Sequence, residues 1–539
     1  MNRIVTETAK RNAVILAAGF GMRMVPINTM YTKGMLEVHG EPLIERLICQ
    51  LHEADIREIY IIVGFMKEAY EYLIDKYHVQ LIINPEYMEK NNLYSLYRAE
   101  KYLKNTYIIP CDVWCRENPF LQNKPESWYM ISDMVDDESI FRVNRKREIS
   151  VTSLQKAGNG MIGIAYVTEK DSALLRKNMH ELIESGNYQD SFWEDALIQD
   201  KIFMLPARIV SAIDIVEINT YEQLRELDEN SNHLKSEALA LIAQVLHVEE
   251  MAIKNITVLK KGMTNRSFLF SCNKQRYIMR IPGEGTDQLI NRREEAEVYD
   301  LINGKKICDE IIYINSENGY KITKYLSNAR VCDAENNNDL EKCMEKLHWF
   351  HNQKLILNHK FDIFNKINFY ESLWQHKNSI YRDYQETKSN IFSLKAYIAS
   401  QPIQTCLTHI DAVPDNFLFY QDSQGIEQIR LIDWEYAAMQ DPHVDIAMFC
   451  IYALYNRKQI DNLIDIYFHK QCDENTRTKI YCYIAICGLL WSNWCEYKLD
   501  LGIEFGEYSL CQYRYAKDFY KIATKRITSI NGGEISCIM

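Results

Sequence analysis

Small residues and an arginine follow the first apolar segment of the chain at a spacing that suits phosphate binding. The loop reads Leu16-Ala17-Ala18-Gly19-Phe20-Gly21-Met22-Arg23. Its small residues are Ala17, Ala18, Gly19 and Gly21. Because these residues have little or no side chain, their backbone N–H groups are able to approach a phosphate closely. Arg23 offers a charge-assisted fork to the same oxygens, and Lys33 adds a second cation. The spacing predicts a phosphate-binding loop; the alternatives are a simple turn and a solvated Lys33.

A second group of polar residues combines an acid with an asparagine five positions later. Asp411 and Asn416 occur in Thr408-His409-Ile410-Asp411-Ala412-Val413-Pro414-Asp415-Asn416. This spacing lets a carboxylate accept a proton from a hydroxyl while the amide oxygen reaches a magnesium ion. Asp433, in Leu431-Ile432-Asp433-Trp434-Glu435-Tyr436, is positioned as a further metal ligand. We interpret His409 as a support for this loop, and Asp441 and Asp445 as structural residues.

Strand and helix patterns alternate in the first part of the chain. Strands are expected at residues 12–18, 58–64, 79–84 and 105–113, and helices at 42–53, 67–76 and around 93–103. This alternation predicts an α/β domain with a doubly wound, mostly parallel sheet and helices on both faces. Ligands of such sheets bind at the carboxyl ends of the strands.

The pattern changes after the polar segment at residues 228–236, where we place a boundary between domains 1–230 and 231–539. Strands at 256–259, 266–271 and 277–281 follow in close succession, as in an antiparallel sheet. From about residue 340 the pattern is mainly helical. The second domain is therefore predicted to be α+β, with a small sheet lobe and a larger helical lobe.

Composition excludes several classes of protein. The 539 residues carry 62 basic and 74 acidic side chains, a formal charge of -12, which gives no general attraction to nucleic acid or to an anionic membrane. The polar start of the chain shows no signal segment, and the longest apolar stretch, 480–494, is too short to span a membrane. A cytoplasmic protein is expected. The 15 cysteines are scattered singly, which predicts buried thiols rather than disulfides or a metal cluster.

The first half resembles the nucleoside-triphosphate transferase family over roughly residues 1–225. The resemblance rests on LAAGxGxR, the following lysine and the glycine-proline turn into a helix. Within the family, the segments 91–96, 156–158 and 192–194 resemble the phosphocholine cytidylyltransferases. The resemblance implies that Gly19, Gly21 and Arg23 hold a triphosphate and that Lys33 stabilises charge on the transferring phosphate. It also implies that Asp112, with Glu217 or Asn219, holds Mg²⁺.

Two interpretations in this half remain open. Asn219 precedes a helical run, so an N-cap is the alternative to a metal ligand. A quaternary ammonium is recognised by aromatic faces and nearby carboxylates, and Trp193 with Glu194 is the preferred pair for it. The alternative for Trp193, and for Trp114, Trp128 and Tyr129, is an aromatic side chain packed in the core.

The second half resembles the choline and ethanolamine kinases over about residues 240–525. The resemblance rests on Gly262-Met263-Thr264-Asn265, an arginine in the third strand, HxDxxxxN and IDxEY. Protein kinases have a lysine at the position of Arg280, and arginine does not simply replace it at a shaped phosphate site. The resemblance implies that Asp411 is the catalytic base and that Asn416 and Asp433 bind metal.

The same resemblance assigns the remaining residues of the second site. Asn265, Arg280 and Glu295 lie on the nucleotide side, with Glu295 available to pair with Arg280. Glu435, Tyr436 and Trp491 contact the amine, with Trp494 as a further aromatic candidate; a packed helix core is the alternative for Trp491 and Trp494. Gly488 stands where some relatives have a second tryptophan.

Together the resemblances imply a bifunctional enzyme that uses ATP, CTP and Mg²⁺. One half would phosphorylate choline, and the other would transfer CMP from CTP to phosphocholine, giving CDP-choline and pyrophosphate. Three alternatives stay open: the same reactions on ethanolamine or another amino alcohol; a sugar-phosphate nucleotidyltransferase fused to an aminoglycoside phosphotransferase-like kinase; and a degenerate, regulatory kinase lobe. The predicted partners are small molecules only.

Overall fold

The computed structural model describes most of the chain. The described residues are 10–19, 24, 26–27, 31–122, 126–136, 139, 141–151, 157–186, 188–198, 205–259, 265–283 and 289–536. Gly21, Arg23 and the predicted turn at 261–264 lie outside these residues.

A seven-stranded sheet forms the centre of the N-terminal half, with the strand order β12-β8-β11-β6-β1-β4-β5. Its strands are β1 (Asn12–Ala17), β4 (Glu58–Val63), β5 (Gln80–Ile83), β6 (Thr106–Pro110), β8 (Trp128–Asp136), β11 (Gly158–Val167) and β12 (Ala207–Val210). Four neighbouring pairs are parallel, and β11 runs antiparallel to both β6 and β8. The mostly parallel sheet is confirmed.

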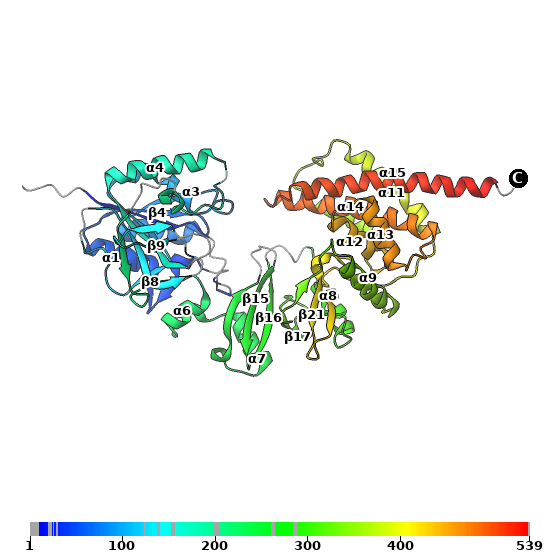
Figure 1. Cartoon of the computed structure of the whole chain (residues 1–539), viewed down its shortest axis with the longest axis horizontal. Helices are drawn as coiled ribbons and strands as arrows, with labels where there is room; N and C mark the ends of the chain where they lie inside the picture. Colours follow the sequence, from blue (N-terminus) through cyan, green and yellow to red (C-terminus); the bar gives the residue numbers. More distant parts are fainter. Residues whose placement is uncertain are drawn as a thin grey trace, which may run out of the picture. The chain divides into compact units, whose positions relative to one another are not determined.

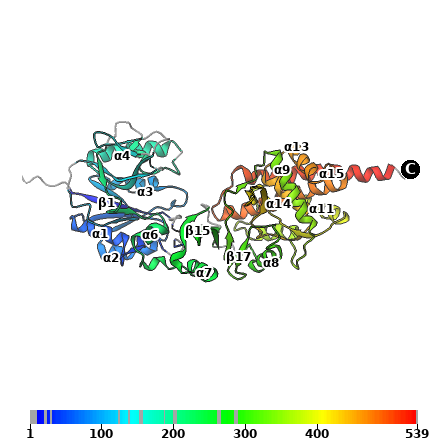
Figure 2. The same ribbon diagram turned by 60° about the horizontal axis from the view of Figure 1, so that its bottom comes forward.

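Alternate residues of β1 point to opposite faces of this sheet. Ala13 and Ile15 belong to the core beneath α1 and α2, whereas Val14 and Leu16 belong to the core beneath α3 and α4. Figure 2 shows β1 between these two helical layers. The helices are α1 (Leu43–Glu53), α2 (Tyr72–Tyr77), α3 (Asn92–Arg98), α4 (Glu169–Glu184), α5 (Asp195–Ile198) and α6 (Tyr221–Leu227). Because β1 is buried on both faces, its sequence is a continuous apolar run rather than an alternating one.

Short pairs of strands extend the N-terminal half. They are β2 (Glu37–Val38) with β3 (Glu41–Pro42), β7 (Val113–Cys115) with β13 (Ile215–Glu217), and β9 (Phe141–Val143) with β10 (Ile149–Val151). Single turns of 3₁₀ helix lie at η2 (Lys33–Met35), η3 (Lys67–Tyr70) and η4 (Glu100–Tyr102). Helix α7 (Glu237–Leu246) follows 3₁₀ turn η5 (Asn232–Leu234) and precedes η6 (Glu250–Ala252).

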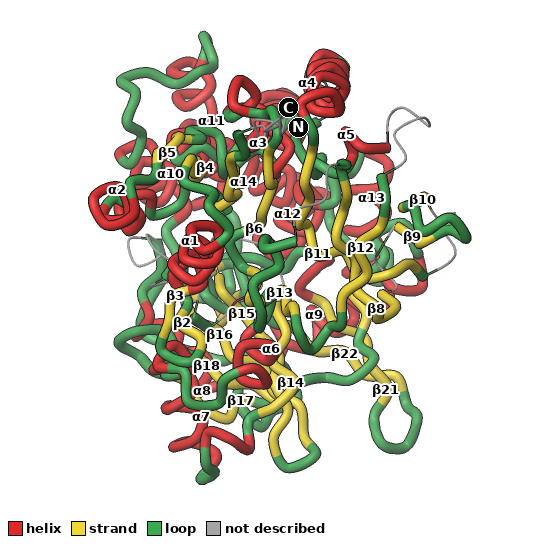
Figure 3. The backbone as a smooth tube through the Cα atoms, turned by 90° about the vertical axis from the view of Figure 1, so that its left-hand side faces the viewer, coloured by secondary structure: helices red, strands yellow, loops and turns green. Residues whose placement is uncertain are grey.

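A five-stranded sheet follows, in the order β14-β15-β16-β18-β17 (Figure 3). Its strands are β14 (Lys254–Val258), β15 (Asn265–Cys272), β16 (Gln275–Pro282), β17 (Ile311–Ile314) and β18 (Lys321–Lys324). Helix α8 (Arg292–Ile302) lies between β16 and β17 in sequence. The expected small antiparallel sheet is confirmed.

The rest of the chain is mainly helical, as expected. Its helices are α9 (Asn337–Asn352), α10 (Ile363–Ser372), α11 (Tyr384–Ser400), α12 (His443–Tyr452), α13 (Arg457–Tyr467), α14 (Glu474–Asp500) and α15 (Glu507–Ser536). The small strands among them are β19 (Arg330–Val331), β20 (Cys406–Thr408), β21 (Phe417–Gln421), β22 (Glu427–Leu431) and β23 (Ala438–Gln440). The 3₁₀ turn η7 (Pro414–Asn416) precedes β21.

The chain divides into two compact units, Met1–Gly262 with Arg266–Lys274, and Met263–Asn265 with Gln275–Met539. This division falls within the five-stranded sheet, later in the chain than the boundary predicted after residue 230. The cysteines among the described residues are free thiols, most of them buried. Within the described residues, every helix is too short or too polar to span a lipid bilayer.

Helix α14 is the centre of the helical core, and it packs against α10, α12 and α15. Figure 1 shows α14 beside α12 and α15. Gly488 lies where α14 meets α15. A Cβ at this position would lie 2.7 Å from the carbonyl oxygen of Gln512 and 2.9 Å from the backbone nitrogen of Ala516. Gly488 is therefore a point of close helix contact, and a tryptophan at this position would collide with the backbone of α15.

We expect Gly488→Ala to destabilise the helical core by about 1–3 kcal/mol, because the added methyl group forces two packed helices apart. Urea unfolding followed by tryptophan fluorescence measures this effect. An unfolding midpoint equal to that of the wild type would show that α15 moves aside without penalty.

Candidate active sites

Lys33 forms the centre of the N-terminal site. Its ammonium donates hydrogen bonds to Oδ2 of Asp112 at 2.6 Å and to Oδ1 of Asn219 at 2.7 Å. Lys33 begins η2, Asp112 follows β6, and Asn219 follows β13. The structure thus brings together three predicted site residues that are far apart in the sequence.

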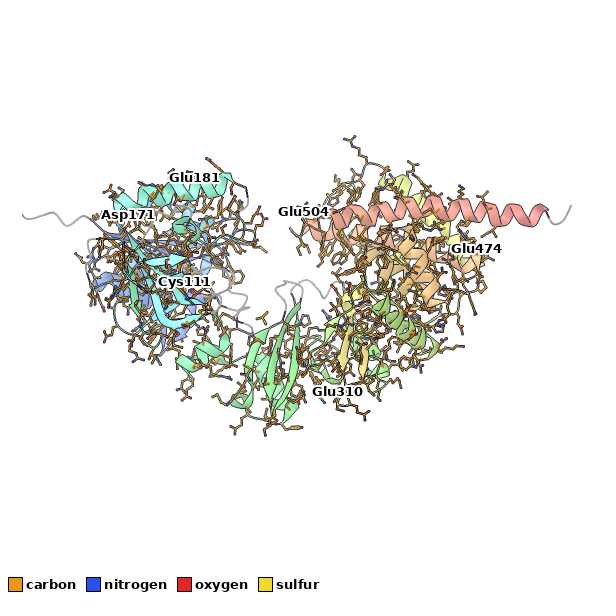
Figure 4. The ribbon with its side chains drawn as sticks, in the orientation of Figure 1. Cys111, Asp171, Glu181, Glu310, Glu474 and Glu504 are labelled. Carbon is orange, nitrogen blue, oxygen red and sulfur yellow. The ribbon has the colours of Figure 1, made fainter. Side chains whose placement is uncertain are left out.

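Strand pairing explains this convergence. The parallel pairing of β1 with β6 brings the ends of both strands to one edge, where the N–H of Cys111 donates to the carbonyl of Leu16. Strand β7 then pairs antiparallel with β13, placing Glu217 opposite Val113. The N–H of Ile218 donates to the carbonyl of Asp112 at 2.8 Å. Cys111, labelled in Figure 4, is buried directly before Asp112.

Asn219 is not the N-cap of α6. The N-cap is Thr220, whose hydroxyl accepts from the N–H of Gln223, while the Gln223 side chain accepts from the N–H of Thr220. Because this capping box serves the helix, the side chain of Asn219 is directed to Lys33 instead.

Two buried alanines lie where β1 ends and the following loop begins. Ala17 and Ala18 are packed into the cores on the two faces of the sheet. A Cβ on Gly19 would meet no atom of the described residues within 4 Å, its chain neighbours aside. Their role in nucleotide binding, like that of Gly21 and Arg23, remains a prediction.

Glu194 is a buried acid with one oxygen unsatisfied. The hydroxyl of Tyr129 donates to Oε1 at 3.1 Å, whereas Oε2 has no hydrogen-bond partner among the described residues. Burial raises the pKa of Glu194 to about 8, and the charge of Glu217 acts in the same direction. A cationic ligand beside this carboxyl would favour its ionised form.

Trp193 lies inside the core rather than on a ligand surface. Its side chain is 1% exposed and packs against Tyr129, with ring centroids 5.9 Å apart. Trp114 and Trp128 are buried as well. The packed-core alternative therefore describes these three tryptophans in this structure, and Glu194 is buried beside them.

Asp411, Asn416 and Asp433 gather in the C-terminal half. The side-chain nitrogen of Asn416 donates to the carbonyl of Asp411 at 2.8 Å and to its Oδ2 at 3.1 Å. Burial, together with the negative charge of Asp433, raises the pKa of Asp411 to about 7. Such a carboxyl is suited to accept a proton near neutral pH.

Backbone contacts hold this loop in an unusual conformation. Ile410 has φ 69°, and Asp445 accepts the N–H groups of His409 and Ile410 at 3.0 and 2.7 Å. His409 is fully buried, and its Nε2 bonds to the carbonyl of Ile432 at 3.0 Å. The supporting role of His409 and the structural role of Asp445 are confirmed. Asp441 is structural too, because it accepts from Lys479 and Tyr483.

Arg280 and Glu295 form the expected pair. The guanidinium donates to both carboxylate oxygens at 2.5 and 2.9 Å, and Arg292 donates to the same carboxylate at 3.0 Å. Oε2 of Glu435 lies 3.9 Å from Nη1 of Arg280 and 3.7 Å from Nη1 of Arg292. Burial and the charge of Asp433 raise the pKa of Glu435 to about 8. Asn265 begins β15, and its side chain is outside the described residues.

The predicted amine residues form an aromatic cluster beside a cavity of about 740 Å³. Glu435 and Tyr436 line the cavity, together with Phe361 and Arg292. The rings of Tyr436 and Trp491 meet edge to face at 5.8 Å, and Trp494 meets Trp491 at 5.4 Å. Trp491 itself is buried, so its ring contributes to the wall of the cluster.

Several residues of this site were missed from the sequence. Arg292 precedes Glu295 by three positions, a spacing that pairs charges on a helix, so a signal for it was present. Tyr370, which stacks on Trp491 at 6.5 Å, comes from α10 and had no sequence signal.

Both sites offer oxygen ligands that suit Mg²⁺. Within the described residues, no three His, Cys, Asp or Glu side chains are grouped so as to hold a metal ion. Each candidate site instead combines acids with an asparagine, and carboxylate and amide oxygens are appropriate donors for this ion. In the N-terminal site, the ammonium of Lys33 donates hydrogen bonds to the same Asp112 and Asn219 oxygens that are the candidate metal donors.

Comparisons with known proteins agree with this division. A family model described as choline/ethanolamine kinase matches residues 256–485, and one described as a MobA-like NTP transferase domain matches residues 13–123. Choline-phosphate cytidylyltransferase of Streptococcus pneumoniae is 30% identical over 228 residues, 41% of this chain and 99% of that protein.

Two further relatives are a cytidylyltransferase and a choline kinase, and each matches about half of this chain. 2-Aminoethylphosphonate cytidylyltransferase of Lancefieldella rimae is 30% identical over 246 residues, 42% of this chain and 96% of that protein. The crystal structure of choline kinase LicA from Streptococcus pneumoniae is 26% identical, covers 53% of this chain and 99% of that chain, and has a TM-score of 0.45. The N-terminal part of the chain therefore belongs to the nucleotidyltransferase family that includes choline-phosphate cytidylyltransferase, and the C-terminal part matches the choline/ethanolamine kinase family model.

Proposed function

We propose that this chain phosphorylates choline with ATP and transfers CMP from CTP to phosphocholine, releasing CDP-choline and pyrophosphate. One observation carries the proposal: a single chain holds both Lys33 between Asp112 and Asn219, and Asp411 beside Asn416 and near Asp433. The product of the second half is the substrate of the first.

In the kinase step, Asp411 accepts the proton of the choline hydroxyl. The hydroxyl oxygen then bonds to the γ-phosphorus of ATP as the bond between the β- and γ-phosphates breaks. Asn416 and Asp433 would hold Mg²⁺, which when bound supplies positive charge to the phosphates. Arg280, fixed by both oxygens of Glu295, lies on the nucleotide side of this site.

In the nucleotidyl transfer step, a phosphate oxygen of phosphocholine bonds to the α-phosphorus of CTP, and the bond to pyrophosphate breaks. The reaction needs charge neutralisation more than a protein nucleophile. Lys33 provides positive charge at the edge where β1 and β6 end. Asp112, with Asn219 or Glu217, would hold Mg²⁺ there.

Choline is favoured as the amine by the aromatic cluster around Tyr436 and Trp491, because a quaternary ammonium interacts with ring faces and donates no hydrogen bond. Ethanolamine is the second candidate. Glu435 lines the same cavity, and a primary ammonium would bond directly to its carboxylate.

The kinase half also favours a phosphate ester over a phosphonate as the acceptor of CMP. The relative from Lancefieldella rimae is named for a phosphonate, 2-aminoethylphosphonate. Phosphoryl transfer to a hydroxyl makes a C–O–P linkage and does not make the C–P bond of a phosphonate. An amino alcohol phosphate is therefore the product that joins the two halves.

We place the enzyme in the cytoplasm, with small molecules as its partners. The formal charge of -12 supports the absence of nucleic acid and anionic membrane surfaces among them.

The proposed sequence of reactions predicts the products of one assay. Purified chain is incubated with ATP, CTP, Mg²⁺ and either choline or ethanolamine, and products are resolved by mass. We expect CDP-choline only when choline, ATP and CTP are all present. Preferential CDP-ethanolamine would change the substrate and keep the mechanism, whereas pyrophosphate release with a sugar phosphate alone would contradict the proposal.

Independent sites predict that the two activities separate by mutation. Asp411→Asn keeps the size of the side chain but removes the proton acceptor, so phosphorylation should fall by about 100- to 10,000-fold. Nucleotidyl transfer from supplied phosphocholine should be unchanged. Asp112→Asn should give the reverse pattern, and loss of both activities in either folded variant would contradict independent sites.

The position of Lys33 predicts a large effect on nucleotidyl transfer. Lys33→Met removes the cation between Asp112 and Asn219, and we expect kcat to fall by about 100- to 1,000-fold. Lys67→Met is the matched control, because Lys67 pairs with Glu68 at the surface. Equal kcat values for the two variants would exclude a charge-stabilising role for Lys33.

A further inference from the structure

Lys321 is a buried cation in the kinase half that no sequence pattern identified. It is 8% exposed and stands directly opposite Arg280 in the antiparallel pair of β16 and β18. Its ammonium donates to the hydroxyl of Tyr299 at 2.5 Å and lies 4.2 Å from the centre of that ring. Burying an ammonium without partners is unfavourable, so the buried position of Lys321 needs a physical explanation.

The hydroxyl of Tyr299 has a second partner in the metal-binding loop. It accepts the backbone N–H of Trp434 at 3.3 Å. Trp434 directly follows Asp433, whose φ of 66° lies in the left-handed region that non-glycine residues adopt at an energetic cost. A conformation of this kind persists where surrounding contacts fix it, and Tyr299 supplies one such contact.

One face of α8 makes both connections. Glu295 binds Arg280, and Tyr299, four residues later, binds Lys321 and Trp434. Residues four apart lie one above the other on a helix. Two cations from adjacent strands are thus joined through α8, and one of them reaches the loop that carries Asp433.

Charged groups around Lys321 act on its ammonium in two opposite directions. Burial, with the charge of Arg280, lowers the pKa of Lys321, while Asp309, Glu295 and Asp433 act in the opposite direction. Three acids therefore face this ammonium. A neutral residue of similar size at position 321 would leave these three acids without the positive charge of the ammonium.

We propose that Lys321 and Tyr299 are positioning residues for phosphoryl transfer, in which Lys321 holds the Tyr299 hydroxyl and this hydroxyl fixes the backbone that presents Asp433. The inference rests on the proposed kinase function. It assigns neither residue to contact with choline or with the transferring phosphoryl group.

The test is a Mg²⁺ titration of choline phosphorylation by the full chain. Tyr299→Phe keeps the ring and removes the hydroxyl, so we expect the half-saturating Mg²⁺ concentration to rise and kcat to fall, each by about 3- to 10-fold. The KM for choline should stay the same, because the cavity lined by Glu435 and Tyr436 is unaltered. Nucleotidyl transfer by the same sample reports that the protein is intact.

Lys321 provides the partner in a double-mutant cycle. Lys321→Met removes this connection and also a positive charge near three acids, so we expect a loss at least as large as that of Tyr299→Phe, and the double variant should be no worse than Lys321→Met alone. Lys321→Arg retains a donor and should recover part of the activity. Lys324→Met, on the same strand with an exposed pairing to Glu310, is the matched control.

The outcomes are distinct. Unchanged Mg²⁺ dependence in both Tyr299→Phe and Lys321→Met, or additive effects in the double variant, would overturn the positioning role. A wild-type chain that phosphorylates neither choline nor ethanolamine would instead contradict the proposed function. In that case, calorimetry measures the affinity of the wild type, Tyr299→Phe and Lys321→Met for ATP with Mg²⁺, a comparison that needs no acceptor.

Discussion

Both sites depend on one constraint: acidic oxygens that are gathered away from water need positive charge beside them. In the N-terminal half, the ammonium of Lys33 lies between Asp112 and Asn219. In the C-terminal half, Arg280 and Arg292 share the carboxylate of Glu295, while burial, together with the negative charge of Asp433, raises the pKa of Asp411. Where the chain's own cations do not neutralise these acids, we expect metal ions with their bound phosphates.

The two halves meet this constraint with different architecture. The nucleotidyltransferase half uses strand ends, because parallel pairing of β1 with β6 and antiparallel pairing of β7 with β13 bring distant segments to one edge. The kinase half uses two loops in strained conformations, each tied by backbone hydrogen bonds. Asp445 holds the loop of Asp411, and Tyr299 contacts the loop of Asp433. Strand ends need little support, whereas loops with left-handed residues need dedicated side chains.

This difference explains how much the sequence could predict. Buried strands such as β1 and β4 were recognisable from continuous apolar runs, and Asp411, Asn416 and Asp433 from spacing within one loop region. Tyr299 and Lys321 were not, because their contact depends on the register of β18 beside β16 and on which face of α8 is inward. Trp193 shows a related limit: an aromatic side chain beside an acid has the same sequence pattern in a core and in a ligand site. At Gly488, where some relatives have a tryptophan, only the packing of α15 reveals the close helix contact.

The two carboxyls predicted to meet the amine share one electrostatic state. Burial raises the pKa of Glu194 and of Glu435, each to about 8. Oε2 of Glu194 lacks a partner among the described residues, and the arginines nearest Glu435 already donate to Glu295. The neutral form of each carboxyl is therefore favoured up to a higher pH than in an ordinary glutamate. A cationic head group would favour the ionised form. In the proposed function, one amino alcohol is the acceptor in the kinase half and its phosphate is the acceptor in the nucleotidyltransferase half, so its ammonium would meet one of these carboxyls in each half.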